Sequence, residues 1–202
     1  MFESGCVTAL FALLPNHGGK IRQNALRVLS VVTTDPAVCQ QLAERDVAKL
    51  APLLDHHDNV HMLQNVMSTI RNTSSSDERF ARGFAMAGIV PKLLSVLQRN
   101  GPEGWASIRT DALSFFLASC TIDAVRDALV QGAGVMVLST IASSSDSQIS
   151  EIETCLILLS TLTSFRYESA YLDNAAQFSI EASCGALTCE NGCKCRMQEV
   201  SL

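Results

Sequence analysis

Four cysteines near the C-terminus match a tetrahedral zinc site by number. Cys184, Cys189, Cys193 and Cys195 form the pattern Cys-x4-Cys-x3-Cys-x-Cys. Folded zinc sites usually carry two Cys-x-x-Cys pairs, and neither pair here has that interval. The closing Cys-x-Cys is more typical of a metal-buffering tail. Two interpretations stay open: a metal-binding or redox-responsive tail, and a tail in which the cysteines are incidental.

The histidines at 56, 57 and 61 are the nearest approach to a second metal site. His57 and His61 are four residues apart, so both imidazoles could face one ion from a single helix, with Asp58 beside them. The pattern His-Glu-x-x-His is absent, however, and a solvated turn leading into a helix uses the same polar residues. We favour the turn.

Other candidates for chemistry are better explained as breaks between helices. Gly132-Ala133-Gly134 lacks the phosphate-loop pattern, and the serine runs at 74–76 and 143–145 have no evident base beside them. We therefore expect no catalytic residue, no cofactor and no enzyme.

Composition indicates a chain with an ample aliphatic core. Of 202 residues, 48% are hydrophobic but only 5% are aromatic, and the formal net charge is -5. An acidic balance argues against nucleic-acid binding and favours a basic peptide partner.

No run approaches the roughly 20 apolar residues of a membrane span, and the first residues do not form a secretion signal. We expect a cytoplasmic or nuclear protein whose thiols at Cys6, Cys39, Cys120 and Cys155 are buried in helices.

A pattern that begins with Gln23-Asn24-Ala25-Leu26 recurs along the chain. Its copies begin at 23, 64, 110 and 153, at intervals of 41, 46 and 43 residues. Periods in this range are typical of helical solenoids, in which each unit buries its apolar side against its neighbours. The sequence thus predicts an all-α array over 1–163, with units at 1–33, 34–74, 75–121 and 122–163.

Each complete unit is predicted to hold a short, a middle and a long third helix. Asp35-Pro36 is a good helix start and opens a short helix to about residue 45, followed by a middle helix over 47–54. The third helices are expected at about 20–33, 60–72, 105–120 and 149–163. Apolar spacing predicts that these bury, among others, Ile21, Val28, Leu117 and Leu156.

Residues 164–202 depart from the repeat pattern. Residues 165–178 have the apolar spacing of a short first helix, and nothing after them supplies the rest of a unit. Either this segment is a cap with a cysteine-rich, disordered tail, or the sequence is part of a longer array.

Glycine before the middle helix and a small residue inside the long one resemble the armadillo repeat. The matching segments are Gly88-Ile89-Val90-Pro91-Lys92-Leu93-Leu94 with Ile108-Arg109-Thr110-Asp111-Ala112-Leu113, and Gly5-Cys6-Val7-Thr8-Ala9-Leu10 with Ile21-Arg22-Gln23-Asn24-Ala25-Leu26. The resemblance covers about residues 2–163 and implies a right-handed α-α superhelix. The two-helix HEAT repeat is the alternative architecture.

The resemblance also implies a function, because third helices of armadillo proteins line a concave groove that binds extended peptides. A recurrent asparagine holds the peptide backbone there. Asn72 matches that position, whereas Val31, Ala118 and Thr161 occupy it in the other units. The tryptophan and asparagine ladder of nuclear-import receptors is therefore absent. A generic protein-interaction scaffold is expected, with these groove residues: Gln23, Arg27, Gln64, Ser68, Asn72, Thr110, Ser114, Glu153 and Thr161.

Overall fold

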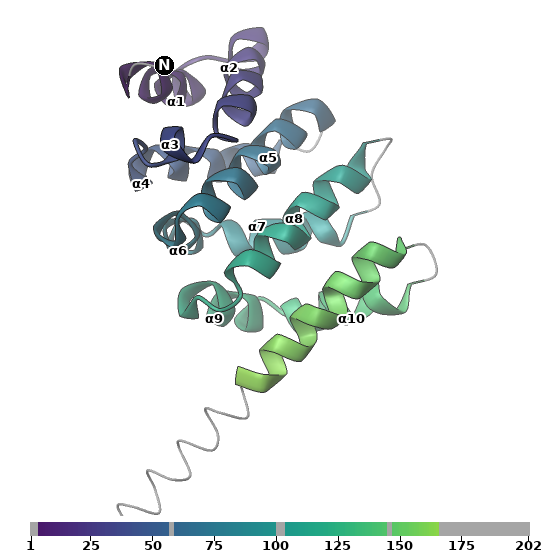
Figure 1. Cartoon of the computed structure of the whole chain (residues 1–202). Helices are drawn as coiled ribbons and strands as arrows, with labels where there is room; N and C mark the ends of the chain where they lie inside the picture. The colour runs from purple at the N-terminus through teal and green to yellow at the C-terminus, as the bar shows by residue number, and fades with distance from the viewer. Residues whose placement is uncertain (1–3, 57–58, 100–103, 145–146, 166–202) are drawn as a thin grey trace, which may run out of the picture. The chain divides into compact units, whose positions relative to one another are not determined.

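The regular structure in the computed structural model is helical throughout the residues that it describes, which are 4–56, 59–99, 104–144 and 147–165 (Figure 1). The elements are α1 (Ser4–Asn16), α2 (Gly19–Val32), α3 (Pro36–Cys39), α4 (Glu44–Val47), the 3-10 helix η1 (Ala48–Asp55), α5 (Val60–Ser76), α6 (Glu78–Met86), α7 (Ile89–Leu97), α8 (Trp105–Ser119), α9 (Asp123–Gln131), α10 (Gly134–Ser143) and a last helix over 149–165. Two units divide the chain, Met1–Leu162 and Thr163–Leu202, and the first holds the stacked helices.

Side-chain caps begin three of these helices. Asp35 accepts a hydrogen bond from the Ala37 backbone N–H at 2.9 Å, and Asp77 accepts one from the Arg79 N–H at 2.9 Å. Asn59 caps α5 in the same way through the Met62 N–H at 3.0 Å. The first N–H groups of a helix have no partner inside it, so such caps determine where a helix begins. The Asp35 cap confirms the helix start predicted at Asp35-Pro36.

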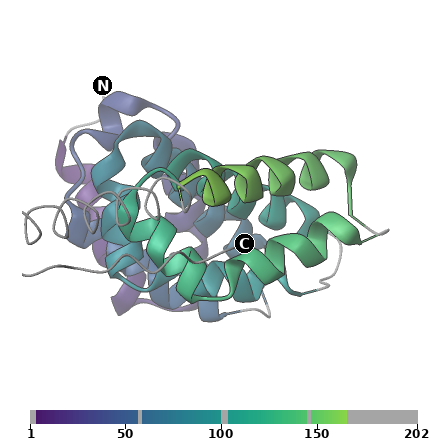
Figure 2. The same ribbon diagram turned by 90° about the horizontal axis from the view of Figure 1, so that it is seen from below.

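The third helices of successive units lie side by side along the array. The third helices are α2, α5, α8 and 149–165; α5 packs against α2 on one flank and against α8 on the other. Figures 1 and 2 show the same ladder from two directions, with helix 149–165 following α8. We call the surface formed by these four helices the third-helix face.

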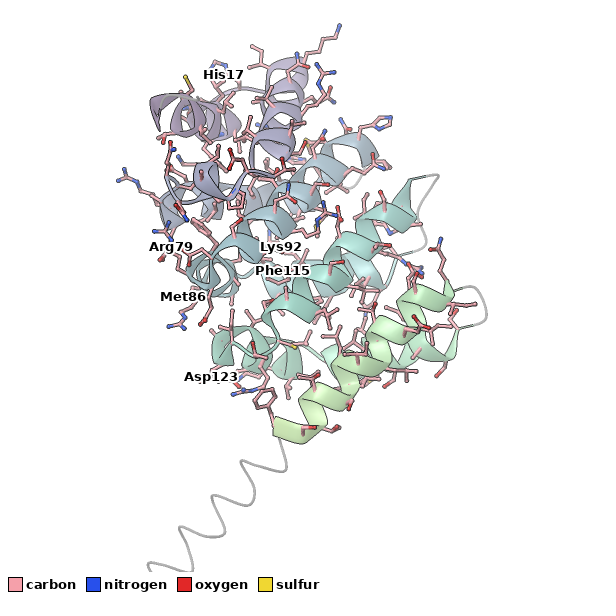
Figure 3. All side chains as sticks on the ribbon, viewed as in Figure 1. His17, Arg79, Met86, Lys92, Phe115 and Asp123 are labelled. Atoms are coloured by element: carbon pink, nitrogen blue, oxygen red, sulfur yellow. The ribbon has the colours of Figure 1, made fainter. Side chains whose placement is uncertain are left out.

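A single apolar core runs through the stacked units. Phenylalanines pack together within it: the Phe115 ring lies edge-on to Phe84 at 6.2 Å and to Phe116 at 5.5 Å between centroids. Figure 3 shows Phe115 inside the stack and Met86 at its edge, on α6. Burial of aliphatic and aromatic side chains between units, rather than within one unit, is what holds a solenoid together.

The second unit differs from the prediction in its first two helices. The expected helix over 35–45 divides into α3 and α4, and the middle segment forms η1 instead of an α-helix. Pro52 lies inside η1, and its missing N–H removes one donor that an α-helix would need there. Short 3-10 segments tolerate such interruptions, so the unit keeps its packing with a tighter turn.

Several residues predicted to be buried are exposed. They are Cys6, Ile21, Val28, Leu117 and Leu156. Apolar spacing identifies the stripe of a helix but not how many neighbours cover it. In a stack, a flank is covered only where another unit packs against it, which explains the exposure of Ile21, Val28 and Leu156 on the first and last third helices. Leu117 lies on the inner helix α8 and is still 41% exposed. The burial prediction was wrong at all five positions.

The described residues contain no single helix that is long and apolar enough to cross a bilayer. Two bent pairs reach the required length together, α6 with α7 across 87° and α9 with α10 across 74°.

Candidate functional site on the third-helix face

Polar side chains join successive third helices across the third-helix face. Ser30 on α2 donates to Asn65 on α5 at 3.1 Å, and Ser68 on α5 donates to Asp111 on α8 at 2.9 Å. Arg71 also pairs with Asp111, whose side chain is 10% exposed. Side chains that face the next unit are therefore partly used to hold the units in register.

A buried ion pair continues this ladder to the last helix. The Arg109 guanidinium on α8 binds both carboxylate oxygens of Glu151, and the Glu151 side chain is 1% exposed. Glu151 also accepts a hydrogen bond from the Gln148 backbone N–H at 3.2 Å, at the start of its helix. A bidentate pair with an additional donor satisfies the carboxylate, which makes its burial tolerable.

The Asn72 amide, which the resemblance assigns to a peptide backbone, is engaged within the chain. Its nitrogen lies 3.1 Å from the Ser30 carbonyl oxygen and 3.3 Å from the Thr33 hydroxyl, and its oxygen accepts from Arg71 at 3.3 Å. A peptide could reach this amide only by displacing these hydrogen bonds. Its role in binding stays a prediction.

Three of the predicted groove residues come together in one hollow between α2 and α5. Gln23 and Arg27 line it from α2, and Gln64 lines it from α5, around a volume of about 360 Å³. The remaining lining residues are Asn24, His61, Met62 and Asn65. Two adjacent units thus supply one polar cavity.

The α5 side of this hollow is held in place by hydrogen bonds. Gln64 donates to the Gly104 carbonyl at 3.2 Å and to the Ser107 hydroxyl at 3.1 Å, while its oxygen lies 3.3 Å from His61 Nδ1. Asn65 donates to the His61 carbonyl at 2.9 Å. This wall is therefore fixed before any partner arrives.

The α2 side of the hollow carries the available donors. Within the described part of the chain, Arg27 forms no ion pair, whereas Arg71 and Arg109 are paired with Asp111 and Glu151. Arg22 uses one of its five donors, because its Nε–H donates to the Leu14 carbonyl at 2.9 Å. Arg27 is thus the third-helix arginine whose five donors remain accessible to a partner.

The other predicted site residues lie farther along the third-helix face, and none of them lines this hollow. Thr110 and Thr161 donate to carbonyls of their own helices, Ala106 at 2.9 Å and Ile157 at 2.9 Å. Ser114 is half-buried and Glu153 is exposed.

The sequence did not assign Asn24, His61, Met62 and Asn65 to the groove, and the two asparagines among them repeat. They occupy the position directly after Gln23 and Gln64 in two copies of the repeat. An asparagine at this position in both copies indicates a polar flank on each helix. It does not show that the flanks of α2 and α5 meet at one hollow.

Metal chemistry finds no support among the described residues. They contain no group of three His, Cys, Asp or Glu side chains that could hold an ion. His57, Asp58 and the four cysteines at 184, 189, 193 and 195 lie outside the described residues. His61 belongs to the hollow and contacts Gln64.

Three of the four described thiols are buried, as predicted. Burial raises the pKa of Cys39 and Cys120, and it raises that of Cys155 to about 11, with the nearby Glu151 charge acting in the same direction. Such thiols remain protonated at neutral pH and are poor nucleophiles and metal ligands.

Comparison with solved structures identifies the architecture. A designed armadillo repeat protein superimposes with a TM-score of 0.66 at 17% identity, over 78% of this chain and 65% of that one. Two engineered proteins of the Northeast Structural Genomics Consortium match with TM-scores of 0.66 and 0.65, at 20% and 21% identity, over 79% and 76% of this chain. The chain spans 63% and 37% of their respective lengths.

Searches against family models and curated proteins return no match. The structural matches are too distant in sequence to transfer a partner, and they establish the fold alone. Repeat period, stacked third helices and these superpositions agree that the chain folds as an armadillo-like α-solenoid.

Proposed function

We propose that the chain is a non-catalytic protein-interaction module that binds an extended segment of a partner protein along the third-helix face. The observation that carries this proposal is the hollow between α2 and α5, where Gln23, Asn24 and Arg27 face a wall formed by Gln64 and Asn65. An armadillo-like fold is consistent with protein binding.

The hollow suits a segment that presents a carboxylate. None of its lining residues is acidic, and Arg27 has no ion-pair partner within the described chain. A guanidinium and a carboxylate form short, charge-assisted hydrogen bonds in a fork geometry.

This local preference differs from the basic partner that the net charge of -5 favours. Net charge describes the whole chain, and acids that pair within it, such as Asp111 and Glu151, are not available to a partner. The accessible charge at the hollow is Arg27. We therefore propose an acidic side chain, flanked by backbone carbonyls for the Gln23 and Asn24 amides.

Selection of a phage-displayed library of linear peptides on the immobilised full chain tests this proposal. Enriched peptides are expected to share an acidic residue. Arg27→Ala should weaken their binding by roughly tenfold to a hundredfold, the effect of losing a charge-assisted hydrogen bond. Arg45→Ala serves as the matched control, because Arg45 is an exposed arginine on α4, away from the hollow.

Two results would contradict the proposal. One is enrichment of peptides without any acidic residue. The other is an equal loss of binding for Arg27→Ala and Arg45→Ala, which would show a general charge effect instead of a site.

A further inference from the structure

Two apolar edges of the array are exposed at positions that are buried in every other copy of the repeat. On α2, Ile21 is 53% exposed and Val28 is 40% exposed. The residues that correspond to Ile21 are Met62, Ile108 and Glu151, and all are buried; those that correspond to Val28 are Thr69, Phe115 and Leu158, and all are buried too. On α5 and on α8, the corresponding flank faces the third helix of the preceding unit.

The last helix shows the complementary pattern on its opposite flank. Leu156 is 54% exposed, whereas Leu26, Met67 and Leu113 at the same repeat position are at most 2% exposed. The middle helix α10 agrees, because Val135 is 41% exposed and its counterparts are buried; those counterparts are Val7, Val47 and Val90. This flank is the one that inner units turn toward the following unit.

The two edges are therefore the two halves of one kind of interface, the contact between successive units. We call them the leading edge (Ile21 and Val28) and the trailing edge (Val135 and Leu156). Inside the array, the flank that corresponds to the trailing edge packs on the flank of the next unit that corresponds to the leading edge, so the two edges are the opposite sides of one type of contact.

Charge at the edges is complementary as well. At the junction of α5 and α8, Gln64 donates to Ser107 at 3.1 Å. The repeat register places Glu153 at the position of Gln64 and Lys20 at the position of Ser107. Where two neutral groups meet inside the chain, an acid and a base would meet between a trailing edge and a leading edge. Neither Lys20 nor Glu153 has an ion pair in the described residues.

We propose that copies of this chain associate head to tail, with the trailing edge of one copy packed on the leading edge of the next. Such a contact is heterologous, since different surfaces meet. It leaves one edge free at each end, so association continues to longer species instead of stopping at a dimer.

Sedimentation equilibrium of the full chain tests the proposal from low to high micromolar concentration. A reductant is included because Cys6 is exposed and could form disulfides between copies. The average mass should rise continuously with concentration. Ile21→Glu and Leu156→Glu should each abolish this rise, and Met86→Glu should not, because Met86 is 82% exposed on α6 away from both edges.

Mixing the two edge variants gives the sharpest result. Leu156→Glu keeps an intact leading edge and Ile21→Glu keeps an intact trailing edge, so their mixture should form a dimer and stop there. Lys20→Glu and Glu153→Lys should each weaken the association of otherwise native chains roughly fivefold, and the double variant should restore it.

Several outcomes would overturn the proposal. One is a native chain that stays monomeric at all concentrations. If Leu156→Glu then also lowers the melting temperature of the chain, the result would indicate that a segment of the same chain covers the trailing edge. A self-associating chain whose mixed variants do not combine would indicate a symmetric contact. Circular dichroism of each variant confirms that it is folded, as expected for half-exposed positions.

Discussion

Replacing Glu151 should loosen the fourth unit from the rest of the array. Its carboxylate binds Arg109 through both oxygens and accepts the Gln148 N–H, and its side chain is 1% exposed. Glu151→Ala removes these bonds and leaves a guanidinium that is 17% exposed without its partner. Breaking a buried pair in this way typically costs about 3–5 kcal/mol, and partial hydration of Arg109 favours the lower end, about 3 kcal/mol.

Urea denaturation followed by circular dichroism measures this loss in the free energy of unfolding. In thermal denaturation of a chain of this size, about 3 kcal/mol corresponds to a fall of about 6–12 °C in melting temperature. Because neighbouring units in a solenoid can unfold separately, hydrogen exchange should show earlier opening of helix 149–165 than of α5.

Two comparisons make the reasoning refutable. Glu153→Ala, on the same helix but exposed, should change the free energy of unfolding by no more than about 0.5 kcal/mol. Arg109→Met combined with Glu151→Leu replaces both charges and should cost less than Glu151→Ala alone. Equal effects of Glu151→Ala and Glu153→Ala, or simple additivity in the double variant, would show that the pair does not join the units.

Two further predictions concern backbone strain and buried thiols. Gly88 and Ala133 precede the middle helices α7 and α10 with φ of 72° and 61°, a left-handed conformation that strains every residue with a Cβ atom. Gly88→Ala should therefore destabilise the chain by about 1 kcal/mol in urea denaturation. Ala133→Gly should stabilise it by a similar amount. The same sign for both would contradict the strain argument. Because the pKa of Cys155 is raised to about 11 from an ordinary value of 9.0, the unfolded chain loses this proton first as pH rises. Stability should therefore decline between about pH 9 and 11, and Cys155→Ala should reduce this decline in denaturation curves; an unchanged decline would contradict it.

Helix positions were largely predictable because they depend on neighbours in the sequence. Asp35 caps a helix where expected, and α8 lies within a residue of its predicted bounds. The exceptions lie in the second unit. The helix predicted over 35–45 divides into α3 and α4, and η1 contains a proline whose effect on a short middle helix was not anticipated.

The candidate site was predicted less completely. Gln23, Arg27 and Gln64 were identified from one repeat position and its neighbour one turn away, and the structure brings them into one hollow. The sequence could not show that Gln64, Ser68 and Asn72 bond to other units, because their partners lie about 40 residues away.

What the sequence determined by itself is the repeating unit. Its period is given by the recurrence of one pattern along the chain, and its capped helices and apolar stripes follow from contacts within a few residues. What only the tertiary structure decided is which flank of each helix is covered and which charges are paired. Arg71 and Arg109 find acids on the next third helix, and Arg27 does not. Those pairings depend on the register in which third helices lie side by side, and register results from packing of the whole stack.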